Sequence, residues 1–234
     1  GWDGKGASGL PVPNGTYTWE FVANAADGTG QAVAVDGSAK VTGSVTVKNS
    51  PTVDIPASFS DVPKGTQFFD EIQWLFSRGI STGWDTPTGK EYRPLQPVNR
   101  DAMAAFMYRM AGSPAYTPPA RSPFVDVTPT TQFYKEISWL ATQGITTGWD
   151  TPKGKEFRPV QQVNRDAMAA FMYRYKKSPA YTAPSTSPFI DIKPSTQFYK
   201  EISWLAAKRV STGWTTPAGA EYRPVQLVNR DAMA

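Results

Sequence analysis

A repeat with a spacing of 65 residues is the feature that most constrains the fold of this 234-residue chain. The string VNRDAMAAFMYR stands at 98–109 and again at 163–174, and VNRDAMA returns at 228–234. Phenylalanines and tryptophans keep the same spacing at 59, 124 and 189 and at 74, 139 and 204. Such a period indicates duplicated supersecondary units that pack on one another.

Composition excludes several kinds of site. The chain has no cysteine and no histidine, which rules out thiol nucleophiles, disulfides, Ser-His-Asp triads and imidazole metal sites. The net charge of +4 suits a mildly anionic partner, but not the dense basic stripe of a nucleic-acid binder. No apolar run reaches transmembrane length, so membrane insertion is not expected. The sequence predicts no catalytic residue, no cofactor and no metal site.

The first helix of each unit is predicted from apolar periodicity. In TQFFDEIQWLFSRG (66–79), Phe68, Ile72 and Leu75 fall on one helical face, and the final glycine is a stop signal. Trp74 lies off that face by helical geometry. We therefore expect Trp74 to be buried in a contact between units.

The second helix of each unit follows a long loop, which spans 80–98 in the first unit. Asn99 is the predicted N-cap, and Met103, Phe106 and Met110 form the predicted inner stripe. Proline-rich connectors separate the units and should be stiff and extended. Each unit is therefore predicted to be helix, long ordered loop, helix.

An arginine stands at the first turn of each second helix: Arg100, Arg165 and Arg230. At this position a side chain lies beside unpaired backbone N–H groups and the positive end of the helix dipole, where a cation is unfavourable for the helix alone. An anionic partner would compensate, and the planar guanidinium suits a carboxylate or phosphate. Pairing with Asp101 or with a carboxylate of the next unit is the structural alternative.

Two further positions repeat a candidate ligand contact. The Gly-Trp loops carry Trp84, Trp149 and Trp214, and the residues that precede a proline are Arg93, Arg158 and Arg223. Sugar C–H faces pack well on aromatic rings. The tryptophans therefore either contact a sugar or pack the long loop, and the arginines either line a groove or brace that loop.

The motifs FSDV, RGISTGW, YRPLQPV and NRDAMAAFMYR resemble the S-layer homology family, in the variant common among high-GC Gram-positive surface proteins. The resemblance covers residues 59–234 and implies a mainly α fold, with three helix-loop-helix repeats in a pseudo-threefold bundle. It also implies polysaccharide-binding grooves between units. The family's binding helix typically starts Thr-Arg-Ala-Glu, whereas this chain has Asn-Arg-Asp-Ala, with an acid at Asp101, Asp166 and Asp231.

The region before the repeats has a different composition, rich in Gly, Thr and Val. Three short alternating runs read as strands: 15–25, 31–37 and 40–49. The segment WDGKGASGLPVPNGTYTW resembles the end of the Ig-like module first described in flagellar hook-assembly proteins, which implies a small β-sandwich spacer. Three strands are too few for a sandwich core, so we expect the missing strands upstream of Gly1, in a longer precursor.

The predicted boundaries follow from these patterns. They are an Ig-like part at 1–50, a linker at 51–58, repeat 1 at 59–112, a linker at 113–123, repeat 2 at 124–177, a linker at 178–188, and a truncated repeat 3 at 189–234.

The resemblance implies a secreted, non-catalytic module at the cell wall. Its partner would be an anionic secondary cell-wall polysaccharide, including pyruvylated forms. One alternative is a structural surface-layer or filament protein that self-associates through its repeats. Another is the C-terminal anchor of an exported enzyme, with the working domain upstream in the same precursor. No nucleic-acid partner is expected.

Overall fold

The computed structural model of the chain describes residues 15–21, 41–47 and 58–234. Two compact units can be separated, Gly1–Pro56 and Ala57–Ala234. In the first, β1 (Gly15–Phe21) pairs antiparallel with β2 (Val41–Val47). The first and third predicted strands are thus confirmed in their described parts, while the predicted strand at 31–37 lies outside the described residues.

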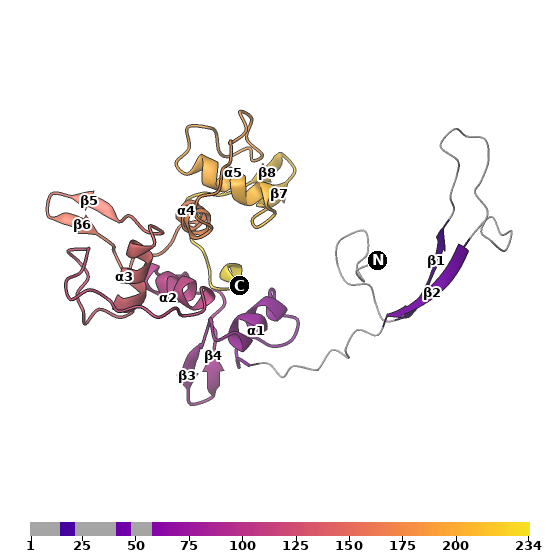
Figure 1. The fold of residues 1–234 in the computed structure, drawn as a ribbon, viewed down its shortest axis with the longest axis horizontal. Helices are drawn as coiled ribbons and strands as arrows, with labels where there is room; N and C mark the ends of the chain where they lie inside the picture. Colours follow the sequence, from indigo (N-terminus) through magenta and orange to yellow (C-terminus); the bar gives the residue numbers. More distant parts are fainter. Residues whose placement is uncertain (1–14, 22–40, 48–57) are drawn as a thin grey trace. The chain divides into compact units, whose positions relative to one another are not determined.

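The second unit repeats one order of elements, shown in Figure 1. The first helices are α1 (Phe69–Ser77), α3 (Tyr134–Thr142) and α5 (Tyr199–Ala207). The antiparallel hairpins are β3–β4 (Trp84–Thr86, Gly89–Glu91), β5–β6 (Trp149–Thr151, Gly154–Glu156) and β7–β8 (Trp214–Thr216, Gly219–Glu221). The third position holds α2 (Arg100–Met110), α4 (Arg165–Tyr175) and the short 3-10 helix η1 (Asp231–Met233). The hairpins lie inside the segments that the sequence presented as long loops.

Most predicted inner residues of repeat 1 are buried. Ile72, Met103 and Phe106 are 0%, 0% and 5% exposed. Phe68 was predicted wrongly, because it precedes α1 with a left-handed φ of 59° and is 40% exposed. Met110, at the end of α2, is 37% exposed.

The helices pack across repeat boundaries. α2 packs on α3, and α4 packs on α5. The Tyr108 ring meets the Trp139 ring edge-on at 5.4 Å between centroids, and Tyr173 meets Trp204 at 5.3 Å. These two tryptophans are therefore buried between repeats, but the same prediction is wrong for Trp74, which is 50% exposed.

A carboxylate and a glycine hold each hairpin in place. In repeat 2, Asp126 accepts the backbone N–H groups of Phe157 at 2.8 Å and Arg158 at 2.7 Å. Gly148, with φ of 67°, leaves room for the Phe124 ring, since an added Cβ would lie 2.7 Å from it. Asp61 and Asp191 accept the corresponding amides of repeats 1 and 3.

Backbone hydrogen bonds join the three repeats in a closed ring. Val98 N–H donates to Val228 O, Val163 N–H to Val98 O, and Val228 N–H to Val163 O, each at 2.9 Å. Repeat 3 is thereby bonded to repeat 1 as directly as neighbouring repeats are bonded to each other.

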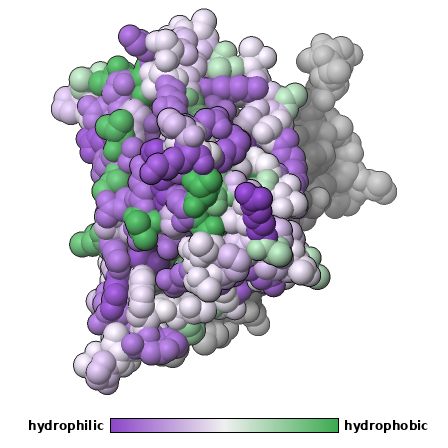
Figure 2. Space-filling view, turned by 90° about the vertical axis from the view of Figure 1, so that its left-hand side faces the viewer, coloured by the Kyte–Doolittle hydropathy of each residue, from purple (hydrophilic) through white to green (hydrophobic). Residues whose placement is uncertain are grey.

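Polar residues cover most of the face in Figure 2, with apolar residues scattered singly among them. Within the described ranges, no helix has both the length and the apolar character needed to cross a bilayer.

Candidate functional site

The start of each second helix is capped by the following repeat. Arg100 N–H donates to Gln161 O at 2.9 Å, and Asp101 N–H donates to Pro159 O at 3.0 Å. Asn99 occupies the N-cap position, but its side chain makes no capping hydrogen bond. The expectation of unpaired amides beside the arginine is therefore wrong, because the next repeat supplies the acceptors. The same pairs recur as Arg165–Gln226, Asp166–Pro224, Arg230–Gln96 and Asp231–Pro94.

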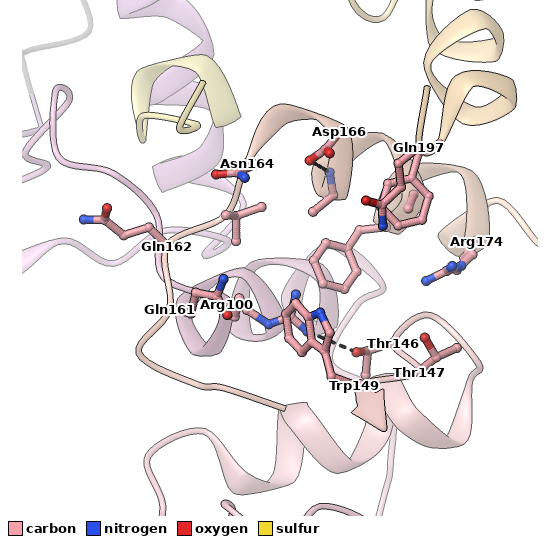
Figure 3. Close-up of a pocket in the computed structure, with 16 residues that line it drawn as sticks. Arg100, Thr146, Thr147, Trp149, Gln161, Gln162, Asn164, Asp166, Arg174 and Gln197 are labelled. Carbon is pink, nitrogen blue, oxygen red and sulfur yellow. Dashed lines mark hydrogen bonds between the residues drawn. The ribbon is translucent and has the colours of Figure 1, made fainter. Parts of the chain in front are cut away.

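The Arg100 side chain reaches from repeat 1 into the hairpin loop of repeat 2 (Figure 3). Its Nε donates to Phe157 O at 2.7 Å, and its Nη2 donates to Thr146 Oγ1 at 3.4 Å. Its guanidinium carbon lies 4.2 Å from the Trp149 ring centroid. Arg100 is only 5% exposed, so the repeats enclose its charge.

The other two arginines make the same contacts one repeat further on. Arg165 Nε donates to Tyr222 O at 2.8 Å, and its Nη2 donates to Ser211 Oγ at 3.0 Å. Arg230 Nε donates to Tyr92 O at 2.6 Å, and its Nη2 donates to Ser81 Oγ at 3.2 Å. Repeat 1 thus contributes an arginine to repeat 2, repeat 2 to repeat 3, and repeat 3 to repeat 1.

Each Gly-Trp tryptophan lies beneath two guanidiniums. Trp149 has Arg100 at 4.2 Å and Arg158 at 4.6 Å from its centroid. The nine candidate residues therefore form three clusters of one tryptophan and two arginines: Trp149 with Arg100 and Arg158, Trp214 with Arg165 and Arg223, and Trp84 with Arg230 and Arg93. Guanidiniums thus compete for the ring faces on which a sugar would pack.

The three arginines at the helix starts have no carboxylate partner among the described residues. Among the described residues, ion pairs involve Arg93, Arg158, Arg223 and two lysines, but not Arg100, Arg165 or Arg230. Burial, and then repulsion from Arg158, lowers the pKa of Arg100 to about 10. Asp101, the proposed internal partner, instead accepts the N–H of Ala102, and burial raises the pKa of its carboxyl.

A pocket of about 450 Å³ lies against the Arg100–Trp149 cluster. Its wall includes Arg174 on α4, together with side chains that carry amides and hydroxyls: Gln161, Gln162, Asn164, Gln197, Thr146 and Thr147. Figure 3 draws the lining residues around the pocket, with Arg100 from repeat 1, Gln197 from repeat 3 and the others that it labels from repeat 2. The carboxylate of Asp166 also lines the pocket, beside two arginines and the neutral hydrogen-bonding groups, which together suit a polar ligand with an anionic group.

Sequence reasoning missed part of this wall. Neither Arg174 nor Gln197 is among the predicted ligand contacts. A signal for Gln197 existed in the TQF string that recurs before each first helix. The adjacent Phe198 and the clustered Arg158 have left-handed φ values of 58° and 59°, and strained non-glycine backbone concentrates at functional sites.

Comparison with known families finds a match in two of the three repeats. Residues 58–104 and 123–169 each match the family model named S-layer homology domain. These matches contain Arg100 and the Trp149 loop, whereas repeat 3 is not among the matched residues. No curated protein matches the chain. Domains of this family generally anchor proteins to the cell wall and are not catalytic. This chain therefore contains two S-layer homology repeats, at 58–104 and 123–169.

Proposed function

We propose that the repeats form a non-catalytic anchor that binds an anionic polysaccharide of the cell wall through the pocket beside Arg100. The observation that carries this proposal is a buried guanidinium without a carboxylate partner, at the wall of an open pocket. Desolvation of a charge is costly unless an opposite charge or good hydrogen bonds compensate. A carboxylate or phosphate on the ligand would provide the missing charge.

The donors of Arg100 decide how the ligand would approach. Its Nε is occupied by Phe157 O, and one N–H of Nη2 is directed to Thr146. The remaining donors are on Nη1 and the outer edge of Nη2, which together can bind two oxygens of one anionic group. Arg174, at the same pocket, would add a second cation.

The tryptophans have a supporting role in this proposal. Trp149 keeps two like charges, Arg100 and Arg158, close to the ligand because each interacts with its ring. Its polar edge would remain for contact with the sugar. The Arg165–Trp214 and Arg230–Trp84 clusters would give further sites, and several weak sites on one chain gain avidity for a repeating polymer.

The finer parts of the hypothesis follow from the same family likeness. They are a pseudo-threefold arrangement of the repeats, a secreted protein held at the wall, pyruvyl groups as one form of the anion, and an upstream domain that the repeats anchor.

Retention on purified cell-wall polysaccharide tests the proposal. We expect Arg174→Ala to weaken retention about tenfold, the usual effect of losing a hydrogen bond to a charged group. Arg121→Ala removes the same charge from the exposed connector and is the matched control, with retention unchanged.

Equal retention by the Arg174→Ala variant, the control and the parent would show that this pocket is not the polymer site. If the parent does not bind polymer but scatters more light as its concentration rises, the surface-layer alternative is favoured. Circular dichroism of each variant confirms that its fold is intact.

A further inference from the structure

Three short segments without a charged residue meet at one end of the repeats, although 19% of the chain is charged. They are 94–99, 159–164 and 224–229, with the sequences PLQPVN, PVQQVN and PVQLVN. Their valines are the three that bond to one another in the closed ring, and isolated bridges also join the segments in pairs. The 18 residues of these segments therefore lie around one point of the fold, and we call this surface the valine end.

An aliphatic side chain projects from each segment of the valine end. Leu95, Val160 and Val225 are 74%, 77% and 76% exposed, which makes them the three most exposed large hydrophobic residues that the structure describes. Each follows a proline in a turn that a hydrogen bond closes, as Gln96 N–H donates to Arg93 O at 3.0 Å in repeat 1. Because the turn and its proline fix the backbone, these side chains can be buried on binding at a low cost in backbone entropy.

The contact between repeats does not explain these aliphatic residues. On either side of Val160, the carbonyls of Pro159 and Gln161 accept the N–H groups that start α2. The backbone of the turn therefore joins the two repeats, while the Val160 side chain stays in solvent.

Other exposed positions of the repeat have diverged. At the tip of each hairpin, the equivalent exposed residues are Thr88, Lys153 and Ala218, which differ in size, polarity and charge. The exposed position of the valine end is aliphatic in all three repeats. Duplication alone does not account for this difference, and exposed apolar residues gathered at one place are typical of an interaction surface.

We propose that the valine end is the contact between two copies of this chain, related by a two-fold axis. A two-fold interface places the same surface of each copy against the other, so charged residues near the axis would meet like charges. A surface without charge avoids this repulsion, and the three aliphatic side chains of one copy pack between those of the other. An anionic polymer or a charged protein would meet no opposite charge within these segments.

The size of the valine end sets the strength of the contact. Its 18 residues are slightly fewer than the about 20 to 30 residues on each side of a standard stable interface. The dimer is therefore reversible and exchanges with the monomer. A two-fold contact also closes on itself, so it gives dimers and not a filament or a lattice.

The contact lies close to the proposed binding site. Gln161 and Gln162 of the valine end also line the pocket beside Arg100, so the dimer places this pocket of one copy near that of the other. In the proposed anchoring role, two copies would offer twice as many sites to a repeating polymer. The contact itself requires no polysaccharide.

Sedimentation equilibrium of the full chain, without polysaccharide, tests the proposal. The parent should change from monomer to dimer as its concentration rises. Val160→Glu brings a carboxylate from each copy into the contact, so the dissociation constant of the dimer should rise at least about tenfold. Val125→Glu is the matched control and should leave this constant unchanged. Val125 is 55% exposed and lies beside the tip of the β5–β6 hairpin, where an added Cβ on Gly154 would be 2.7 Å from it.

Three results would overturn the inference. A parent that stays monomeric at the highest concentration would show that the valine end does not bind a second copy. Equal dissociation constants in the parent and both variants would place the contact on another surface, and a mass that grows beyond the dimer would show a contact that does not close. Unfolding temperatures of both variants equal to that of the parent confirm that their fold is intact. No measurement here uses polysaccharide, so this inference and the proposed anchoring function fail independently.

Discussion

Arg100, Arg165 and Arg230 are held by carbonyl oxygens, hydroxyls and rings instead of by carboxylates. A guanidinium tolerates this environment better than an ammonium, because it is planar, stacks on rings and donates in a fixed direction from each nitrogen. The carbonyl and the hydroxyl satisfy two donors, and the ring offsets part of the burial cost. The positive charge of these three arginines is not balanced by a carboxylate, which is why we propose an anionic ligand there.

Tyr92, which directly precedes Arg93, gives a prediction about alkaline pH. Tyr92 OH donates to Arg230 O at 2.6 Å, and burial raises the pKa of Tyr92 from 10.0 to about 12. The unfolded chain therefore loses this proton first, so the free energy of unfolding should fall as pH rises from 10 towards 12. Tyr92→Phe should reduce this fall, at a cost of about 1 kcal/mol at neutral pH for the lost hydrogen bond.

Urea unfolding of both proteins at pH 8 and at pH 10.5 measures the effect. Repeat 2 has Phe157 at the equivalent position, 0% exposed, so the ring alone fits the site. Parallel loss of stability in the parent and the variant over this pH range would contradict the assignment.

At the scale of elements, a glycine decides whether the hairpin can pack on the residue that opens each repeat. Gly148 and Gly144 have φ values of 67° and 68°, so alanine is strained at both. Only at Gly148 does an added Cβ meet other atoms, 2.6 Å from Glu156 O and 2.7 Å from the Phe124 ring. Gly144→Ala is therefore a matched control for backbone strain alone.

We expect Gly144→Ala to destabilise the fold by about 1–2 kcal/mol, the penalty for a left-handed residue with a Cβ. Gly148→Ala should cost at least about 3 kcal/mol, because the hairpin and Phe124 must also separate. Thermal unfolding followed by circular dichroism compares the two variants. Equal unfolding temperatures would show that the contact with Phe124 does not constrain the hairpin.

The helices of the repeats could be predicted from sequence because their signals are local. Apolar spacing located α1 and α2 within a few residues, and the position of Asn99 marked the start of α2. The partners of that start could not be predicted, since Arg100 bonds to Phe157, 57 positions along the chain. Trp74 was misplaced for a related reason. Trp139 and Trp204 are buried against a tyrosine of the preceding repeat, whereas Trp74 has no such ring contact among the described residues and is half exposed.

At the scale of the whole repeat unit, the arginine side chains donate from repeat 1 to 2, 2 to 3 and 3 to 1, and the valine amides donate in the opposite direction, from repeat 2 to 1, 3 to 2 and 1 to 3. A linear repeat array unfolds from its ends, because each terminal repeat has one neighbour. In this unit repeats 1 and 3 are also bonded to each other, so residues 58–234 should unfold in a single transition.

Arg230→Met tests this closure. The methionine keeps apolar volume over Trp84 but removes both side-chain hydrogen bonds to repeat 1. We expect a loss of about 1.5–3 kcal/mol and faster amide exchange in the Trp84 hairpin than in the Trp149 hairpin. Arg121→Met, at an exposed site, should change neither quantity. Uniform acceleration of exchange in all three hairpins would show that the ring opens as a whole and is not weakened at one joint.

In the proposed anchoring role, the valine ring would have a mechanical consequence. Tension applied at residue 58 would act first on repeat 1. In that repeat, Val98 is hydrogen-bonded to Val163 of repeat 2 and to Val228 of repeat 3. Repeat 1 would separate from the other repeats only after both of these hydrogen-bonded contacts break. The force would therefore be shared with repeat 3 from the start. A closed ring of this kind would resist unfolding at repeat 1, the repeat that such tension would reach first.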